Sequence, residues 1–258
     1  MFALRMLLCV GFLLPLFALA EKLTVGAEDD AAPWSYADGS GYVNDVVRAA
    51  YEAVKWDLTL EVLPYARCKR MAEDGELAAC FTTSKTPQTE QRLQFAAIPA
   101  ITARNVLLAR SNSTLKGCDP QAWEREVSVG LVNEYEYLPA VEALRRSNAV
   151  SVQVTTSEGF ALRMLTGGRV DAAVLTLDPV KRIELVAALA GVRPDFKVIC
   201  DFGGLPGYIA FSRAHPKALA ALNAFNDGMK IIQKDGTVTR IQRQWAQRAL
   251  MAAVAKKP

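Results

Sequence analysis

The chain has 258 residues, of which 51% are hydrophobic and 22% are charged, and its formal net charge is +3. These values are ordinary for a folded globular protein and exclude wholesale disorder. The small net charge gives no electrostatic basis for binding nucleic acid, and the single histidine, His215, excludes histidine-rich metal sites. The length allows one large domain or two smaller ones.

Residues 1–20 have the pattern of a signal peptide. Arg5 precedes an apolar run that ends in the small-residue sequence Ala-Leu-Ala at residues 18–20. The run is shorter than the ~20 residues that a membrane-spanning helix needs, so we expect cleavage rather than a membrane anchor. The mature chain is then expected to begin at Glu21 and to be exported as a soluble protein.

Four cysteines remain after removal of the signal peptide: Cys68, Cys80, Cys118 and Cys200. An oxidising compartment favours disulfides, and the spacing does not match a compact zinc site. Of the three possible pairings, Cys68–Cys80 and Cys118–Cys200 are favoured because each pair stays within one of the two lobes described below. Free buried thiols are the alternative.

The first part of the mature chain alternates short strands with amphipathic helices. Strands are expected at residues 23–26, 58–63 and 77–81, and helices at 43–54 and 64–74. Gly75 follows the second helix at a position typical of a C-cap. This β-α-β-α-β order favours a parallel sheet with crossover helices.

A second unit of the same kind is expected between about residues 105 and 200. Residues 163–172 repeat a pattern of residues 70–79: Arg-Met, then a glycine, then a buried strand. Further strands are expected at 127–132 and 150–154, with a helix at 138–145. The repeat favours two α/β lobes over one long sheet.

The C-terminal part lacks a β-α-β unit of its own. It contains an expected strand at 208–211, an amphipathic helix at 216–233, and a final helix at 238–253 after an Asp-Gly-Thr turn. It must therefore return to a lobe already formed. We expect lobe 1 to comprise residues 21–102 and 207–258, and lobe 2 residues 103–206. Two crossings make a hinge, and small-molecule sites commonly lie at such interfaces.

Six short motifs, in this order and spacing, resemble the periplasmic solute-binding proteins of family 3, the type that serves amino-acid ABC importers. They are residues 33–41 (PWSYADGSG), 64–67 (PYAR), 82–87 (TTSKTP), 167–173 (GGRVDAA), 207–211 (GYIAF) and 234–237 (KDGT). The resemblance covers essentially the whole mature chain. It implies a periplasmic-binding-protein-like fold of two α/β lobes, each a mostly parallel sheet flanked by helices, joined by two hinge crossings and closing on a ligand.

The resemblance also implies ligand-binding positions in lobe 1. The aromatic residue that opens the second helix, Tyr65, is expected to pack on the ligand. Thr82 and Ser84, before the Thr-Pro step, are expected to form hydrogen bonds with it. The loop around Trp34 is expected at the rim of the cleft, where the indole could stack on a planar ligand or attract a cation.

Three departures from the pattern concern the ligand. The arginine that pairs with the α-carboxylate in amino-acid binders falls at Thr89, and a hydroxyl cannot replace a bidentate guanidinium. The small pair after the first strand of lobe 2 becomes Glu-Tyr-Glu-Tyr at 134–137. The position of the ligand-amine aspartate is Thr176. Recognition of a standard α-amino acid therefore does not follow from the resemblance.

Three residues are candidates to compensate for these departures. Arg67 follows Tyr65 by two positions and could supply the missing cation. Tyr135 or Tyr137, but not both, is expected to face the cleft, and Tyr135 is the candidate. Asp178 lies two residues beyond the aspartate position and could take its role if the loop is shifted.

The sequence thus predicts a monomeric periplasmic protein that captures a small polar solute, an amino acid or a related compound, for an inner-membrane ABC permease. No cofactor, metal, nucleic acid or catalysis is expected, since no nucleophile elbow, phosphate-binding loop or dinucleotide motif is present. One alternative is a dehydratase of cyclic carboxylic acids that uses Glu134, Glu136 or Asp178 as acid or base. The other is a ligand sensor that docks on a membrane receptor.

Overall fold

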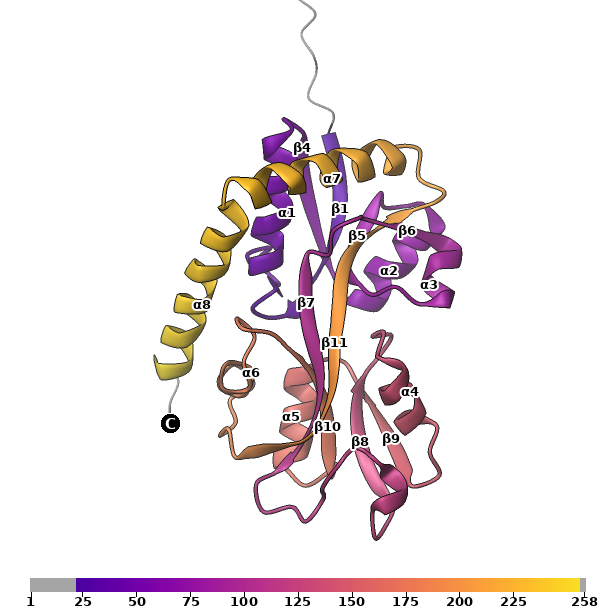
Figure 1. Cartoon of the computed structure of the whole chain (residues 1–258), viewed down its shortest axis with the longest axis vertical. Coiled ribbons are helices and arrows are strands. Elements are labelled where there is room, and N and C mark those ends of the chain that lie inside the picture. The colour runs from indigo at the N-terminus through magenta and orange to yellow at the C-terminus, as the bar shows by residue number, and fades with distance from the viewer. Residues whose placement is uncertain (1–21, 256–258) are drawn as a thin grey trace, which may run out of the picture.

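The computed structural model describes residues 22–255, with side chains up to residue 251. The expected signal peptide lies outside the described residues. Two lobes stand one above the other, and two long strands, β7 and β11, run through both (Figure 1). The predicted two-lobed α/β fold is confirmed.

Lobe 1 is built on strands in the order β4-β1-β5-β11, with β6 paired to β11. β1 is parallel to β4 and β5, whereas β11 is antiparallel to β5 and β6. The strands are β1 (Lys22–Glu28), β4 (Asp57–Leu63), β5 (Ala79–Thr83) and β6 (Leu93–Phe95), with the small pair β2 (Asp30–Ala31) and β3 (Ser35–Tyr36). The helices are α1 (Tyr42–Ala53), α2 (Tyr65–Asp74), α3 (Pro87–Arg92), α7 (Ala218–Lys234) and α8 (Thr237–Ala255).

Lobe 2 continues the strand order as β7-β10-β8-β9. β8 is parallel to β10 and β9, and β10 is antiparallel to β7. Its elements are β8 (Val127–Val132), β9 (Val150–Thr155), β10 (Ala172–Leu177), α4 (Pro139–Arg145), α5 (Glu158–Thr166), α6 (Ile183–Ala190) and a 3-10 turn at Pro120–Ala122. In both lobes the parallel strands are joined by crossover helices, as the β-α-β reading predicts.

The two crossings between the lobes are the antiparallel strands β7 (Ile101–Arg110) and β11 (Phe196–Ser212). The sequence predicts only residues 208–211 of β11 as strand. Gly203, Gly204 and Pro206, which precede them, are of types common in loops. Pairing with β7 extends the strand through them, with register shifts near Cys200 and Gly203. The lobe limits predicted after residues 102 and 206 fall inside these two strands and stay a prediction.

Local signals in the sequence locate the helix ends well. α1 and α2 begin and end within one residue of the expected positions, and Gly75 caps α2 with a left-handed φ of 83°. The expected strand at 77–81 lies two residues later, at Ala79–Thr83. Leu77 and Ala78 are nonetheless buried, as the apolar run at 77–81 indicates.

Both predicted disulfides are present in the structure. Cys68 in α2 is bonded to Cys80 in β5, which fastens the helix to the sheet of lobe 1. Cys118 is bonded to Cys200 across 82 residues of sequence and fastens the segment after β7 to β11. One disulfide therefore lies in each lobe, and neither links the two lobes to each other.

Helix α7 crosses α1 at Gly228, and the approach leaves no room for a side chain. A β-carbon at Gly228 would lie 1.9 Å from the carbonyl oxygen of Ala50. Alanine normally stabilises a helix by up to ~1 kcal/mol relative to glycine, but backbone atoms cannot yield by that distance. We expect Gly228→Ala to lower the free energy of unfolding by about 1–3 kcal/mol in urea titrations. Asn223→Ala, at an exposed position of α7, is the control and should not destabilise; equal stability of the two variants would contradict the close approach.

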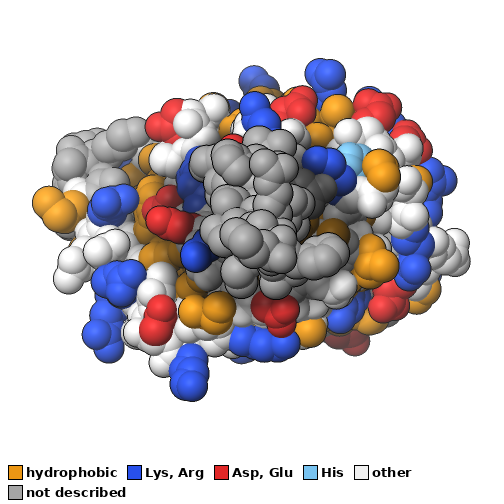
Figure 2. All heavy atoms as spheres, turned by 90° about the horizontal axis from the view of Figure 1, so that it is seen from above, with side chains coloured by type: hydrophobic (Ala, Val, Ile, Leu, Met, Phe, Trp, Pro, Cys, Tyr) orange, Lys and Arg blue, Asp and Glu red, His pale blue; other side chains and the backbone are white. Residues whose placement is uncertain are grey.

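The surface at the lobe 1 end mixes charges of both signs. Lys and Arg side chains alternate with Asp and Glu over the face seen in Figure 2. Among the described residues, no helix has the length and apolar character needed to cross a bilayer.

Candidate functional site

A cavity of about 30 Å³ lies between the lobes. Residues of both lobes and of the crossing strands line it: Glu28, Trp34, Tyr65, Thr82, Ser84, Ile101, Ala103, Tyr135, Glu136, Thr176, Leu205 and Gly207. It adjoins a groove of about 920 Å³ that shares Tyr135, Glu136 and Leu205 with it and extends between α3 and α4. The interlobe space thus consists of a narrow inner chamber and a wide mouth.

Strand direction explains why the polar residues of lobe 1 meet here. Glu28 ends β1, and Thr82 and Ser84 lie at or just beyond the end of β5, which is parallel to β1. Tyr65 opens α2 directly after β4, which is also parallel to β1. Carboxyl ends of parallel strands meet at one sheet edge, which is where α/β folds bind ligands. In this chain that edge faces lobe 2.

The structure places most of the predicted site residues together. Trp34, Tyr65, Thr82, Ser84 and Tyr135 line the cavity. Of the pair Tyr135 and Tyr137, Tyr135 lines the inner cavity, and both line the adjoining groove.

The remaining two candidates are placed differently. Asp178 is not among the residues that line the cavity. Its carboxylate accepts a hydrogen bond at 2.7 Å from Nε1 of Trp34, which does line it. Arg67 is exposed on α2 and is not among the lining residues of the cavity or of the groove.

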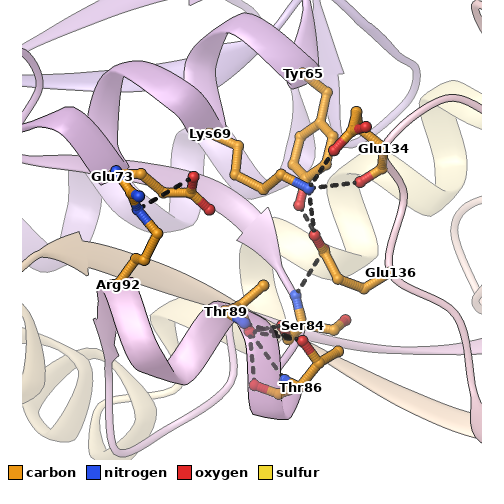
Figure 3. A network of polar contacts seen from close by, with 9 residues as sticks. All are labelled: Tyr65, Lys69, Glu73, Ser84, Thr86, Thr89, Arg92, Glu134 and Glu136. Atoms are coloured by element: carbon orange, nitrogen blue, oxygen red, sulfur yellow. Dashed lines mark hydrogen bonds and ion pairs between the residues drawn. The ribbon is translucent and has the colours of Figure 1, made fainter.

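Glu136 of lobe 2 binds three groups of lobe 1. Its carboxylate accepts hydrogen bonds from the Tyr65 hydroxyl at 2.5 Å, from Lys69 Nζ at 3.0 Å and from the Ser84 backbone N–H at 3.2 Å. Tyr65 and Lys69 are one helical turn apart on α2, so both reach the same carboxylate (Figure 3). Lys69 also contacts Glu134 Oε2 at 3.2 Å. The cation of α2 that lies beside the cavity is therefore Lys69 rather than Arg67, and it is already paired.

The Thr89 hydroxyl is taken up by local hydrogen bonds, although the residue lies at the groove. Its hydroxyl donates to the Ser84 carbonyl oxygen at 3.0 Å and accepts from the Thr86 N–H at 2.9 Å, which closes a capping box at the start of α3 (Figure 3). The side chain is buried in this local structure. Where the resemblance implies a carboxylate-binding arginine, this chain has a helix cap.

A second interlobe contact joins Tyr135 of lobe 2 to Glu28 of lobe 1. The Tyr135 hydroxyl donates to Glu28 Oε1 at 2.5 Å, and its ring meets Tyr65 edge-on at 5.3 Å. Burial raises the pKa of the Glu28 carboxyl to about 8, although the Tyr135 hydrogen bond and the Lys181 charge lower it in part. Burial likewise raises the pKa of the Tyr135 and Tyr65 hydroxyls. Glu28 is therefore largely protonated near neutral pH.

A buried ion pair lies beside Trp34. Lys181 Nζ is 2.6 Å from Glu158 Oε2 and 3.9 Å from the centre of the Trp34 ring, and both charged side chains are almost fully buried. Asp178 holds the turn that carries Lys181 by accepting from the Val180 and Lys181 backbone N–H groups. The ammonium thus has a carboxylate on one side and an aromatic face on the other.

Sequence reasoning missed Glu28, Lys69 and the Lys181–Glu158 pair as site residues, and it named Glu136 only as a possible acid or base of the dehydratase alternative. Charged residues in loops are solvated by default, and their partners lie far away in the sequence. The alternation at 134–137 does not find Glu136, because these residues are not in a strand and Tyr135 and Glu136 both line the chamber. Within residues 22–255, no three His, Cys, Asp or Glu side chains are arranged to hold a metal ion.

The Glu136 contacts predict a change in lobe closure. Glu136→Ala removes three hydrogen bonds between the lobes, and charged hydrogen bonds of this kind each contribute about 1.5–3 kcal/mol. Without ligand, the variant should shift toward an open form with a larger radius of gyration in small-angle X-ray scattering. Glu134→Ala, which removes an exposed rim carboxylate, is the control. A Glu136→Ala scattering curve that superimposes on the wild-type curve would rule out this role.

Two lobes that meet over a mixed polar and aromatic cavity define a clamp-type binding protein for small molecules. The chain belongs to the bacterial extracellular solute-binding proteins, family 3, whose sequence model matches residues 23–248. No curated protein sequence matches it significantly.

Solved structures with the same fold are distant in sequence. A histidine kinase sensor domain with similarity to periplasmic binding proteins is 18% identical with a TM-score of 0.75, over 87% of this chain and 95% of that one. The arginine-, lysine-, histidine-binding protein ArtJ from Geobacillus stearothermophilus is 19% identical, with a TM-score of 0.72, over 87% and 95%. The ancestral amino acid-binding protein AncCDT-1, a precursor of cyclohexadienyl dehydratase, is 20% identical with a TM-score of 0.69, over 87% and 94%.

Proposed function

We propose that this protein captures a small polar solute between its lobes in the periplasm and presents it to an inner-membrane ABC permease. The observation that carries the proposal is the interlobe cavity, which is lined by residues of both lobes. Hydrogen bonds join the two lobes beside it. A solute that touches both lobes stabilises the closed form, and a permease can read that form. The amino-acid-binding proteins of the same fold support a small-molecule cargo.

The test is recovery of bound solute from the mature protein. Native mass spectrometry of the chain purified from periplasm should reveal a small molecule. Calorimetric titration of unliganded, refolded protein with that molecule should reproduce binding, and Tyr65→Ala should weaken it at least tenfold. Lys230→Ala, on the exposed face of α7, is the control. No bound solute, together with unchanged uptake when the gene is deleted, would refute the transport role.

A dehydratase activity is the second candidate, and one observation favours it. The Glu28 carboxyl is buried in the cleft with its pKa raised to about 8, which suits a general acid. The fold is shared with a dehydratase precursor. Turnover of prephenate or arogenate by the wild type, lost in Glu28→Gln, would establish catalysis; no turnover by either leaves binding as the function.

The receptor-docking alternative shares the same solute site. Its support is the fold shared with a histidine kinase sensor domain. Pull-down with the closed, solute-loaded protein should recover permease subunits under the transport proposal. Recovery of a membrane kinase instead would favour sensing.

A further inference from the structure

We propose that the cargo of this cleft is a small organic cation, an amine or guanidine with no carboxylate on the carbon that bears its amino group. The inference rests on the proposed function and specifies its substrate class. It is carried by the charges, the aromatic walls and the shape of the interlobe space.

The inner cavity offers a ligand two carboxyl groups and no cation. Glu28 and Glu136 are among its lining residues, and no Lys or Arg is. Next to the chamber, Lys69 is already paired with Glu136 and Glu134, and Lys181 with Glu158. The other cations of the interlobe space, Lys85, Arg145 and Arg146, line the outer groove rather than the chamber. A ligand carboxylate would enter beside the Glu136 carboxylate with no unpaired cation in the chamber, which is costly without a compensating charge.

The groups that would otherwise receive a ligand carboxylate are occupied by the protein itself. The Ser84 backbone N–H donates to Glu136, and the Thr89 hydroxyl donates to the Ser84 carbonyl oxygen. The Glu136 carboxylate thus already accepts from three donors of lobe 1: the Tyr65 hydroxyl, Lys69 and the Ser84 N–H.

A cation finds the opposite situation. Among residues 22–255, Tyr135 is the hydrogen-bond donor to the Glu28 side chain, at Oε1, so Oε2 remains without a donor although only 6% of this residue is exposed. The rings of Trp34, Tyr65 and Tyr135 also line the chamber. Carboxylate oxygens and aromatic faces together are the groups that recognise ammonium and guanidinium.

Next to the chamber, the protein pairs one of its own ammonium groups with an aromatic ring and a carboxylate in this way. The Lys181 ammonium lies 3.9 Å from the centre of the Trp34 ring and 2.6 Å from Glu158. A ligand cation between Glu28 and the rings of Tyr65 and Tyr135 would have the same surroundings: a carboxyl group on one side and aromatic rings on the other.

The shape indicates how much of the ligand is enclosed. A chamber of about 30 Å³ holds a single head group, and the remainder must extend past Tyr135 and Glu136 into the groove of about 920 Å³. The structure thus assigns the cationic head to the chamber and the chain of the ligand to the groove.

Matched pairs that differ only by the carboxylate test the proposal. Unliganded mature protein is titrated by calorimetry with agmatine and arginine, cadaverine and lysine, and ethanolamine and serine. In at least one pair the amine should bind at least tenfold more tightly than its amino acid. Tighter or equal binding of the amino acid in every pair that binds would overturn the cation assignment and leave solute capture intact.

Two further outcomes separate this inference from the proposed function. If none of these probes binds but native mass spectrometry finds an anionic or zwitterionic solute, the cation assignment fails alone. If no solute of any kind is found and deletion of the gene leaves uptake unchanged, both proposals fail.

The residue assignment is tested with Glu28→Gln, which copies the shape of the protonated carboxyl and should keep the melting temperature. It should weaken binding of the preferred amine at least tenfold. The same substitution at the exposed Glu52 of α1 is the control and should leave affinity unchanged. Amine affinity within twofold of wild type in Glu28→Gln would overturn the role of Glu28.

Discussion

Lys181→Met is expected to lower the free energy of unfolding by about 3–5 kcal/mol, because it leaves the Glu158 carboxylate buried without its counter-charge. The two side chains are only 2% and 5% exposed, and their charged atoms are 2.6 Å apart. Methionine preserves much of the volume of lysine, so the loss is electrostatic rather than a cavity effect. Urea unfolding followed by tryptophan fluorescence measures it.

A double variant separates the charge from the packing. Lys181→Met with Glu158→Gln removes both charges, while the glutamine carbonyl can still accept from the Thr176 N–H that now donates to Glu158 at 2.6 Å. Much of the stability should return. Lys230→Met removes one partner of an exposed pair with Asp227 and should cost at most about 1 kcal/mol. Similar losses in Lys181→Met and Lys230→Met would show that the buried pair does not stabilise the fold.

Amine affinity is expected to rise about tenfold per pH unit from pH 6 to about 7.5 and to level off above about pH 8. The Glu28 carboxyl is protonated below its pKa of about 8, and a bound cation favours the ionised form, so binding releases a proton. A ligand that brought a carboxylate would favour the protonated form, and its affinity would fall as pH rises. Calorimetry in buffers of different ionisation enthalpy counts the released protons directly.

The groups around Glu28 also influence the pH at which its carboxyl titrates. They are Tyr135, which donates to it, the charges of Lys181, Glu158 and Asp29, and the nearby hydroxyl of Tyr65. Glu28→Gln should abolish the pH dependence between 6 and 8, whereas Glu52→Gln should retain it. A slope that persists in Glu28→Gln would assign the proton to another group.

The same shift affects the unliganded fold. Because the folded pKa of Glu28 lies above its ordinary value of 4.5, its contribution to stability is complete below about pH 4.5 and is lost as pH rises to about 8. Affinities should therefore be measured well below the melting temperature at every pH.

The sequence alone predicted the parts of this protein that depend on local periodicity and local caps. Helix α2 and its Gly75 cap, the parallel strands β1 and β4, and the disulfide Cys68–Cys80 all follow from residues close together in the chain. The family motifs also indicated Tyr65, Thr82 and Ser84, which line the cavity.

Only the tertiary structure decided the electrostatics of the cleft. The contacts of Glu136 with Tyr65, of Tyr135 with Glu28 and of Asp178 with Trp34 join residues 71, 107 and 144 positions apart. A charged residue read in sequence is assigned to solvent, since burial of a charge is costly unless a partner is present. The partner of such a charge is known only from the contacts between the lobes. The sequence therefore predicted the two-lobed fold, whereas the tertiary structure determined which charged side chains are paired in the cleft.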